Sequence, residues 1–177
     1  MLAPFIYTKI LGWKNVGVIP KEIPKMVLIM APHTSWQDFP IAILARATFG
    51  VPVNFIGKAS LFKGPLGFIF RWLGGAPVNR DKSTNFVANI VRIFEEKKVF
   101  RLALSPEGTR EKVTKWKTGF YYIAKGANVP IVLLTLDFGK KQVKASAPYY
   151  PTDDVEKDMA YFKEFYKDVQ GKVPELF

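Results

Sequence analysis

The sequence predicts an α/β fold in which helices flank a largely parallel or mixed central sheet. Apolar runs typical of strands alternate with helical patterns of about ten to fifteen residues, as in strand–helix–strand units. Hydrophobic residues make up 49% of the 177-residue chain and charged residues 23%, so a sizeable core can form. The sequence shows no internal repeat and no low-complexity tract. We therefore expect one domain over residues 1–177, with an amphipathic helix at its N-terminus.

The first half of the chain predicts three strands separated by helices. Residues 25–32 form a continuous apolar run that ends at a proline, as expected of a buried strand that stops at a loop. A helical pattern covers residues 39–50, and a second strand covers 51–58. A short helix over 64–75 closes with two glycines and leads into a short third strand over 76–80.

The second half continues the alternation. Ser83 or Thr84 can cap a helix over residues 85–98, and a strand that begins at 99 runs into a loop that ends at 110. The remaining predicted elements are, in order, a helix over 119–127, a strand over 129–138, a strand over 141–150 and a helix over 154–171. Because most strands are joined through helices, their carboxyl ends are expected to meet at one edge of the sheet.

Residues 1–20 are predicted to be an amphipathic, membrane-associating segment. Leu2, Ile6, Ile10 and Trp13 fall on one helical face, which suits either a helix lying in a membrane interface or a helix packed on the core. The segment lacks a basic start and a cleavage site, so we expect no signal peptide. No apolar run reaches the roughly 20 residues of a spanning helix, so we expect no transmembrane helix.

The charge of the chain points to an anionic partner. Lysine and arginine total 26 against 15 acidic residues, a net charge of +11 and a pI near 9.8. Nucleic acid and anionic lipid both fit that charge. Aromatic residues make up 15% of the chain, and several lie in apolar runs flanked by lysines, which favours an anionic membrane surface and no nucleic acid. We therefore predict a cytoplasmic protein attached peripherally to the membrane.

The chain has no cysteine and one histidine, His33. Disulfides, cysteine zinc sites, thiol nucleophiles and multi-histidine metal sites are thereby excluded. We predict that the protein uses neither a metal nor a cofactor.

Polar side chains follow four of the predicted strands. His33, Lys58 and Arg80 come at or just beyond the ends of three strands, and the segment SPEGTR, residues 105–110, follows another. Active groups of open α/β sheets collect at such ends. We expect these residues to meet at one edge of the sheet.

His33 and Asp38 fit the pattern of a general base and the carboxylate that orients it. Histidine is the side chain whose ordinary pKa suits proton uptake near neutrality, and a nearby aspartate stabilises the imidazolium. The sequence offers no G-x-S-x-G nucleophile, so the activated hydroxyl belongs to a substrate and the natural chemistry is acyl transfer to an alcohol. Alternatively, Asp38 only caps the following helix, or Ser35 and Asp38 form a capping box.

Five segments together resemble the glycerophospholipid acyltransferases, the family that includes lysophosphatidic acid acyltransferase. PHTSWQD is similar to the family's N-H-x-S-x-x-D motif, and PEGTR contains its E-G-T-R motif. The other three segments are FIGKASLFKGPLG, GGAPVNR and KWKTGFYYIAKGANVPIVLL. All occur in family order over roughly residues 26–136, which makes the combined signal strong.

The resemblance implies an enzyme that moves a fatty acyl group from acyl-CoA or acyl carrier protein to a lysophospholipid hydroxyl. The favoured acceptor is 1-acyl-glycerol-3-phosphate, which would give phosphatidic acid. His33 would be the base and Asp38 its orienter, while Lys58, or a backbone N–H beside it, would stabilise the thioester oxygen, unless Lys58 is only a solvated lysine. The substrate-binding residues implied by the match are Arg80, Glu107, Gly108, Thr109 and Arg110.

Within that set the two arginines would hold the acceptor phosphate. Glu107 would pair with one of them or hold an acceptor hydroxyl, and Gly108 would allow close backbone approach. The sequence departs from the family at Pro32, Ser105 and Glu111, which replace an asparagine, a phenylalanine and a small polar residue.

Several interpretations stay open. The acceptor is alternatively a lyso-aminolipid or another phosphate-free lysolipid. Outside enzymes, the alternative is a basic membrane-binding module in which His33 does nothing. The apolar stretch Leu66 to Leu73 either is ordinary core, or lines an acyl channel or enters the bilayer. Lys112, Lys115 and Lys117 around Trp116 either contact anionic partners or form an exposed loop.

Overall fold

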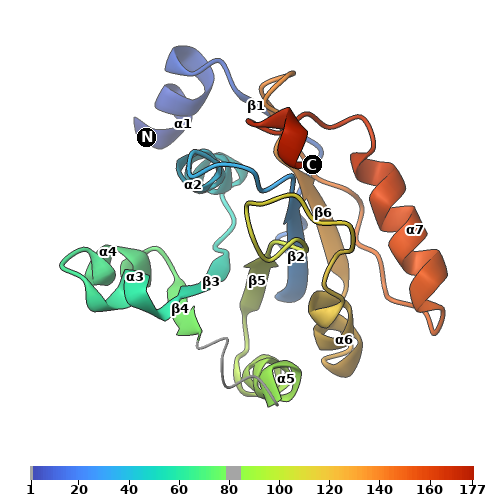
Figure 1. Cartoon of the computed structure of the whole chain (residues 1–177). Helices are drawn as coiled ribbons and strands as arrows, with labels where there is room; N and C mark the ends of the chain where they lie inside the picture. The colour runs from blue at the N-terminus through green and yellow to red at the C-terminus, as the bar shows by residue number, and fades with distance from the viewer. Residues whose placement is uncertain (1, 79–84) are drawn as a thin grey trace.

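A parallel five-stranded sheet forms the centre of the protein. The computed structural model describes residues 2–78 and 85–177, and it confirms the predicted α/β class. The strand order is β4-β3-β5-β2-β6, and every pairing in this sheet is parallel (Figure 1). The strands are β2 (Lys25–Ala31), β3 (Asn54–Lys58), β4 (Gly75–Val78), β5 (Phe100–Leu104) and β6 (Ile131–Thr135).

Helices cover both faces of this sheet, as Figure 1 shows. One face carries α5 (Phe86–Glu96), α6 (Gly119–Gly126) and α7 (Val155–Tyr166), whose buried aromatic and aliphatic side chains pack on β2, β5 and β6. The other face carries α2 (Asp38–Phe49) together with the N-terminal segment. Buried residues of α5 and α7 recur four positions apart, as Ile90 with Phe94 and Phe162 with Tyr166, so each helix presents one apolar stripe to the sheet.

Helix starts and the last strand differ in part from the predictions. The proposed caps Ser83 and Thr84 lie outside the described residues. The predicted strand over 141–150 is reduced to β7 (Gln142–Lys144), which pairs with β1 (Lys14–Val16) in a separate parallel ribbon that was not predicted. The residues that follow β7 form no further strand in the described part of the chain, and they pair with β6 through isolated antiparallel bridges, Leu134 with Ala145 and Ile131 with Tyr149. Pro148, which has no N–H to donate, lies in that stretch.

The predicted helix over 64–75 is the shorter helix α4 (Gly67–Trp72). A second short helix that was not predicted, α3 (Ala59–Lys63), precedes it, and Gly64 and Pro65 lie in the connection between the two. A Cβ on the buried Gly67 would lie 2.3 Å from the carbonyl oxygen of Phe62, so the two helices approach more closely than any other residue would permit. We call residues 59–72 the α3–α4 hairpin. Of the interpretations left open for Leu66 to Leu73, ordinary core fits the buried Gly67 and the inward-packed Phe70, but it does not fit the exposed Leu66, Phe68, Ile69 and Trp72.

The N-terminal segment divides its apolar residues between the core and the surface. Helix α1 (Leu2–Phe5) continues as a π-helical turn, η1 (Ile6–Ile10), and the chain then bends away. Trp13 therefore lies outside the helix, where it packs edge-on against Phe138 at 4.9 Å, and the predicted four-residue face is split. Tyr7 is buried, whereas Leu2, Phe5 and Ile10 are exposed. The interfacial and the core-packing interpretations each hold for part of the segment.

None of the helices within residues 2–78 and 85–177 is long and apolar enough to cross a membrane. The chain closes with a short 3-10 helix, η3 (Pro174–Leu176).

Candidate active site

Two adjacent strands carry the predicted reactive groups to one edge of the sheet. β2 and β5 are neighbours in register, with Ile29 opposite Leu104, so the loops that follow them begin side by side. The β2 loop contains His33, and the β5 loop contains Glu107. As expected for parallel strands, residues far apart in sequence meet here.

His33 and Asp38 form a hydrogen-bonded pair. The imidazole Nδ1 lies 3.0 Å from Oδ2 of Asp38, and the same oxygen accepts the backbone N–H of Ser35 at 2.8 Å. Asp38 is 1% exposed and is the first residue of α2. Because its carboxylate points back into the loop, the simple helix-capping interpretation is wrong. The alternative of a capping box is borne out, since the Ser35 hydroxyl accepts the N–H of Gln37 at 3.2 Å while Asp38 accepts the N–H of Ser35. Asp38 thus takes part in the box and orients His33 with the same oxygen.

This geometry sets which nitrogen of His33 can react. A proton on Nδ1 is held by the buried carboxylate, so the lone pair is left on Nε2. The His33 side chain is 28% exposed, which leaves the ring open to a substrate. The pair therefore has the arrangement of a general base with its orienting carboxylate.

Glu107 holds the backbone of the loop between β2 and α2, residues 32–37, which carries the predicted base His33 and which we call the catalytic loop. Its carboxylate is buried, Oε1 accepts the backbone N–H of His33 at 3.0 Å, and Oε2 accepts the hydroxyl of Ser105 at 2.6 Å. The Ser105 oxygen in turn accepts the N–H of Gly108 at 3.3 Å. These bonds tie the β2 loop to the β5 loop. In the described part of the chain Glu107 forms no ion pair with Arg110.

The next three predicted residues, Gly108, Thr109 and Arg110, follow Glu107 in the β5 loop. Gly108 has φ +67°, and a Cβ there would approach the side chain of Lys117 to 2.9 Å, which accounts for glycine at this turn. Thr109 accepts the N–H of Glu111 at 3.3 Å, and the side chain of Arg110 is exposed.

Lys58 ends β3, on the other side of β5 from β2. Its side chain is exposed and makes no hydrogen bond or ion pair with any residue that the structure describes. Arg80 lies outside the described residues. The structure thus brings together His33, Asp38 and Glu107, and leaves the roles of the predicted cations as predictions.

The comparisons with known proteins identify the family of the chain. The sequence model of the acyltransferase family matches residues 17–136, which include both loops. The chain belongs to the acyltransferase family. The prediction that the protein is an acyltransferase enzyme is thereby confirmed.

The fold of this acyltransferase is also similar to a solved structure. The crystal structure of the 1-acyl-sn-glycerophosphate (LPA) acyltransferase PlsC from Thermotoga maritima superposes with a TM-score of 0.65 and 22% sequence identity. The match covers 94% of this chain and 76% of that one. None of the curated proteins that were compared matches the chain.

The C-terminal part of the acyltransferase braces the catalytic loop, which the sequence did not predict. The hydroxyl of Tyr166 donates to the carbonyl of Ile29 at 2.8 Å, and the N–H of Val173 donates to the buried Thr34 hydroxyl at 3.1 Å. Burial, with a smaller contribution from the negative charge of Glu107, raises the pKa of Tyr166 well above its ordinary value, so the phenol stays a neutral donor. Tertiary contacts of this kind leave no local sequence pattern.

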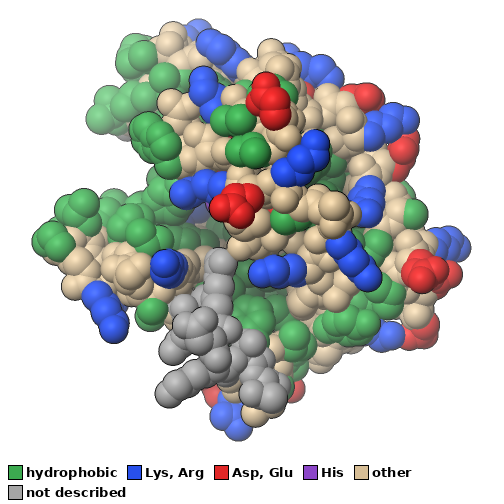
Figure 2. Space-filling model, in the orientation of Figure 1, with side chains coloured by type: hydrophobic (Ala, Val, Ile, Leu, Met, Phe, Trp, Pro, Cys, Tyr) green, Lys and Arg blue, Asp and Glu red, His purple; other side chains and the backbone are tan. Residues whose placement is uncertain are grey.

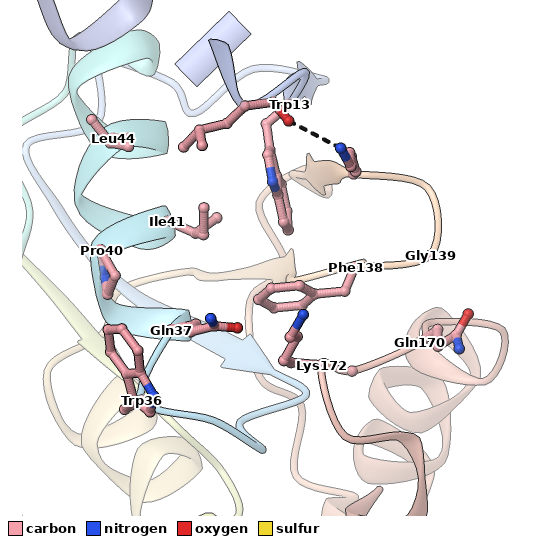
Figure 3. A pocket seen from close by; sticks show the side chains of 13 residues that line it. Trp13, Trp36, Gln37, Pro40, Ile41, Leu44, Phe138, Gly139, Gln170 and Lys172 are labelled. Atoms are coloured by element: carbon pink, nitrogen blue, oxygen red, sulfur yellow. Dashed lines mark hydrogen bonds between the residues drawn. The ribbon is translucent and has the colours of Figure 1, made fainter. Parts of the chain in front are cut away.

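A pocket of about 530 Å³ lies beside the catalytic loop (Figure 3). Trp36 and Gln37, from the segment between His33 and Asp38, form part of its wall, and apolar side chains form most of the rest. His33, Asp38 and Glu107 do not line it, so this pocket is not where the reacting groups meet. No group of three or more metal-ligating side chains is found in the described ranges, 2–78 and 85–177.

Proposed function

We propose that this acyltransferase moves a fatty acyl group from the thioester of acyl-CoA or acyl carrier protein to the free hydroxyl of a lysophospholipid. The acceptor that we favour is 1-acyl-glycerol-3-phosphate, and the product is then phosphatidic acid. One observation carries the proposal: the buried Asp38 orients His33, and the ring can activate only a hydroxyl that a substrate brings.

The reaction follows from the chemistry of this pair. Nε2 of His33 removes the proton of the acceptor hydroxyl while the oxygen attacks the thioester carbonyl carbon. The C–O bond forms, the tetrahedral intermediate collapses, and the C–S bond breaks. The departing sulfur takes the proton from the imidazolium, which restores neutral His33. Throughout, the Asp38 carboxylate stabilises the positive charge of the ring.

The acceptor phosphate is assigned to the cations around the β5 loop. Arg110 is exposed beside the Glu107 turn, and Lys112, Lys115 and Lys117 follow it. A guanidinium suits bidentate binding of a phosphate, and we assign this role to Arg110 together with Arg80. Lys58, or a backbone N–H beside it, is assigned to the developing oxyanion. The similar protein from Thermotoga maritima is named for 1-acyl-sn-glycerophosphate, which supports a phosphate-bearing acceptor here.

The enzyme is proposed to work at the cytoplasmic face of an anionic membrane, because both the acceptor and the product are lipids. The net charge of +11 favours that surface. The exposed Leu2, Phe5 and Ile10 of the N-terminal segment supply an apolar contact with it.

Acyl transfer from a radiolabelled long-chain acyl donor tests this proposal. Acyl-CoA and acyl carrier protein are each offered with lysophosphatidic acid and with a phosphate-free lysolipid. We expect transfer to lysophosphatidic acid by the wild type and a loss of about 10³-fold in His33→Ala. Tyr150→Ala, an exposed position outside the site, is the control and keeps full activity.

Other outcomes of that assay would change the proposal. Equal transfer to the phosphate-free acceptor would replace the phosphate-binding assignment with the phosphate-free alternative. Transfer that persists in His33→Ala would remove His33 as the base.

A further inference from the structure

The outer surface of the α3–α4 hairpin carries large apolar side chains that the described part of the chain leaves exposed. Five of the fifteen exposed large hydrophobic residues in the described part of the chain lie within this one hairpin. They are Leu61 (48% exposed), Leu66 (59%), Phe68 (68%), Ile69 (36%) and Trp72 (82%). Exposed apolar side chains are normal when scattered, but a contiguous group marks an interaction surface.

The inner surface of the hairpin is already packed. Phe62 is buried and lies 6.0 Å from the ring of Phe70, which in turn contacts Phe39 at 5.6 Å. Phe39 also packs edge-on against Phe55 of β3. These contacts fix the hairpin to the sheet, so a small rearrangement cannot bury its outer residues. The same chain of rings reaches the residue next to Asp38, and so connects the hairpin to the catalytic loop.

The charged residues of the hairpin and of β3, which precedes it, are all positive. Lys58, Lys63 and Arg71 are exposed on or beside it, and the sequence contains no aspartate or glutamate from Phe39 to Arg80. The Arg71 guanidinium lies 5.7 Å from the centre of the Phe62 ring. Apolar side chains bordered by cations and free of acids match the boundary between lipid tails and anionic headgroups. A nucleic acid would leave the apolar side chains uncovered.

The placement of the hairpin also suits a flat surface. In Figure 1 the hairpin projects from the β4 end of the sheet, and α1 projects toward the same side of the view. Figure 2 shows hydrophobic surface on both projections, with Lys or Arg side chains beside the lower one and a hollow between them. One bilayer can therefore touch both projections while the surface between them stays open.

From these observations we infer that the α3–α4 hairpin is a membrane-inserting element. Leu66, Phe68 and Trp72 enter the interfacial layer of an anionic bilayer, and Lys63 and Arg71 contact the phosphates of its headgroups. The inference deepens the proposed function, because it identifies the part of the enzyme that meets the lipid from which the acceptor comes. Insertion itself does not depend on the acyltransferase reaction.

Binding of the full chain to sedimented vesicles tests the inference directly. The vesicles are phosphatidylcholine alone and phosphatidylcholine with phosphatidylglycerol. We expect binding mainly to the anionic vesicles, and a reduction of about tenfold in Phe68→Ser/Trp72→Ser. The matched control is Tyr122→Ser/Tyr150→Ser, which removes two exposed aromatic side chains elsewhere and retains binding. Far-ultraviolet circular dichroism and melting temperature show that each variant is folded.

Activity separates this inference from the reaction. With an acceptor embedded in vesicles, Phe68→Ser/Trp72→Ser should lose activity in proportion to its lost binding. With a short-chain lysophosphatidic acid that is dissolved as monomers, it should match the wild type. If no variant and no wild type transfers an acyl group, the proposed function fails while the vesicle result still decides the inference. Wild-type binding by the folded double variant would overturn the inference and point to a protein partner for the hairpin.

Discussion

Two neighbouring regions of the molecule differ in which side chains they bury. They are the loops after β2 and β5, and the α3–α4 hairpin after β3. In the loops, the acidic side chains of Asp38 and Glu107 are buried, and hydrogen bonds hold them to the backbone around His33. In the hairpin, large apolar side chains such as Trp72 are exposed. In the first region, burial and hydrogen bonding of two carboxylates fix the orientation of one histidine. The second leaves large apolar side chains in contact with water, where we infer that a bilayer covers them. On that inference, the reaction and the lipid contact belong to separate elements.

The largest effect is expected from the orienting carboxylate. Asp38→Asn keeps the shape of the side chain but removes the charge that stabilises the His33 imidazolium, so kcat should fall by about 10³-fold with little change in KM. Steady-state kinetics with a soluble acceptor measures both constants. Asp137→Asn is the matched control, because Asp137 is equally buried but lies outside the site. A loss of less than threefold in Asp38→Asn would show that the pair is structural.

An intermediate effect is expected from Ser105, which acts on His33 through Glu107. Ser105→Ala removes the hydroxyl that donates to Glu107 and accepts from Gly108, so the carboxylate should hold the His33 backbone less firmly. We expect kcat to fall about tenfold while KM stays within twofold.

Ser105→Thr restores a hydroxyl and should recover most of the lost kcat. If Thr gives no recovery, or if KM rises instead of kcat falling, Ser105 does not position the loop.

The smallest effect on catalysis is expected from the packing of the hairpin. Gly67→Ala places a Cβ against the Phe62 carbonyl and should destabilise the protein by about 1–3 kcal/mol, lowering the melting temperature by several degrees. Gly64→Ala is the matched control, because open space surrounds a Cβ at that position. Turnover of a soluble acceptor should be unchanged in both variants, whereas vesicle binding should weaken only in Gly67→Ala. Equal melting temperatures would show that the two helices separate easily.

Much of the reactive pair could be predicted from local sequence. His33 and Asp38 are five positions apart in a loop between a strand and a helix, so the folding of one short segment brings them together. The contact between the His33 backbone and Glu107 joins residues 74 positions apart, and it depends on β2 and β5 being neighbours in the sheet. In the sequence Ser105 is only a departure from the family pattern, because its hydrogen bonds with Glu107 and Gly108 depend on how the β5 loop folds.

The burial of side chains in the α3–α4 hairpin is harder to predict from the sequence than the pairing of His33 with Asp38. A run such as LGFIFRWL has the composition of a core helix, and Phe62 and Phe70 do pack inward. The local sequence does not reveal that β4 is an edge strand of the sheet and that β3 lies next to it. At that edge few other elements are available to cover the outer side chains of the hairpin. The N-terminal segment is a similar case, since a π-helical turn places Trp13 off the helix that its spacing suggested.

The sequence by itself determined the alternation of strands and helices, the +11 charge, the family and the single histidine with its aspartate, because periodicity, composition and short motifs are local properties. The assignment of residues 1–177 to one domain stays a prediction. Only the tertiary structure decided that Glu107 and Ser105 hold the catalytic loop, that the C-terminal segment braces it, and that the hairpin faces outward. Which groups a side chain hydrogen-bonds, and whether it is buried, depend on the distant segments that the strand order places beside it.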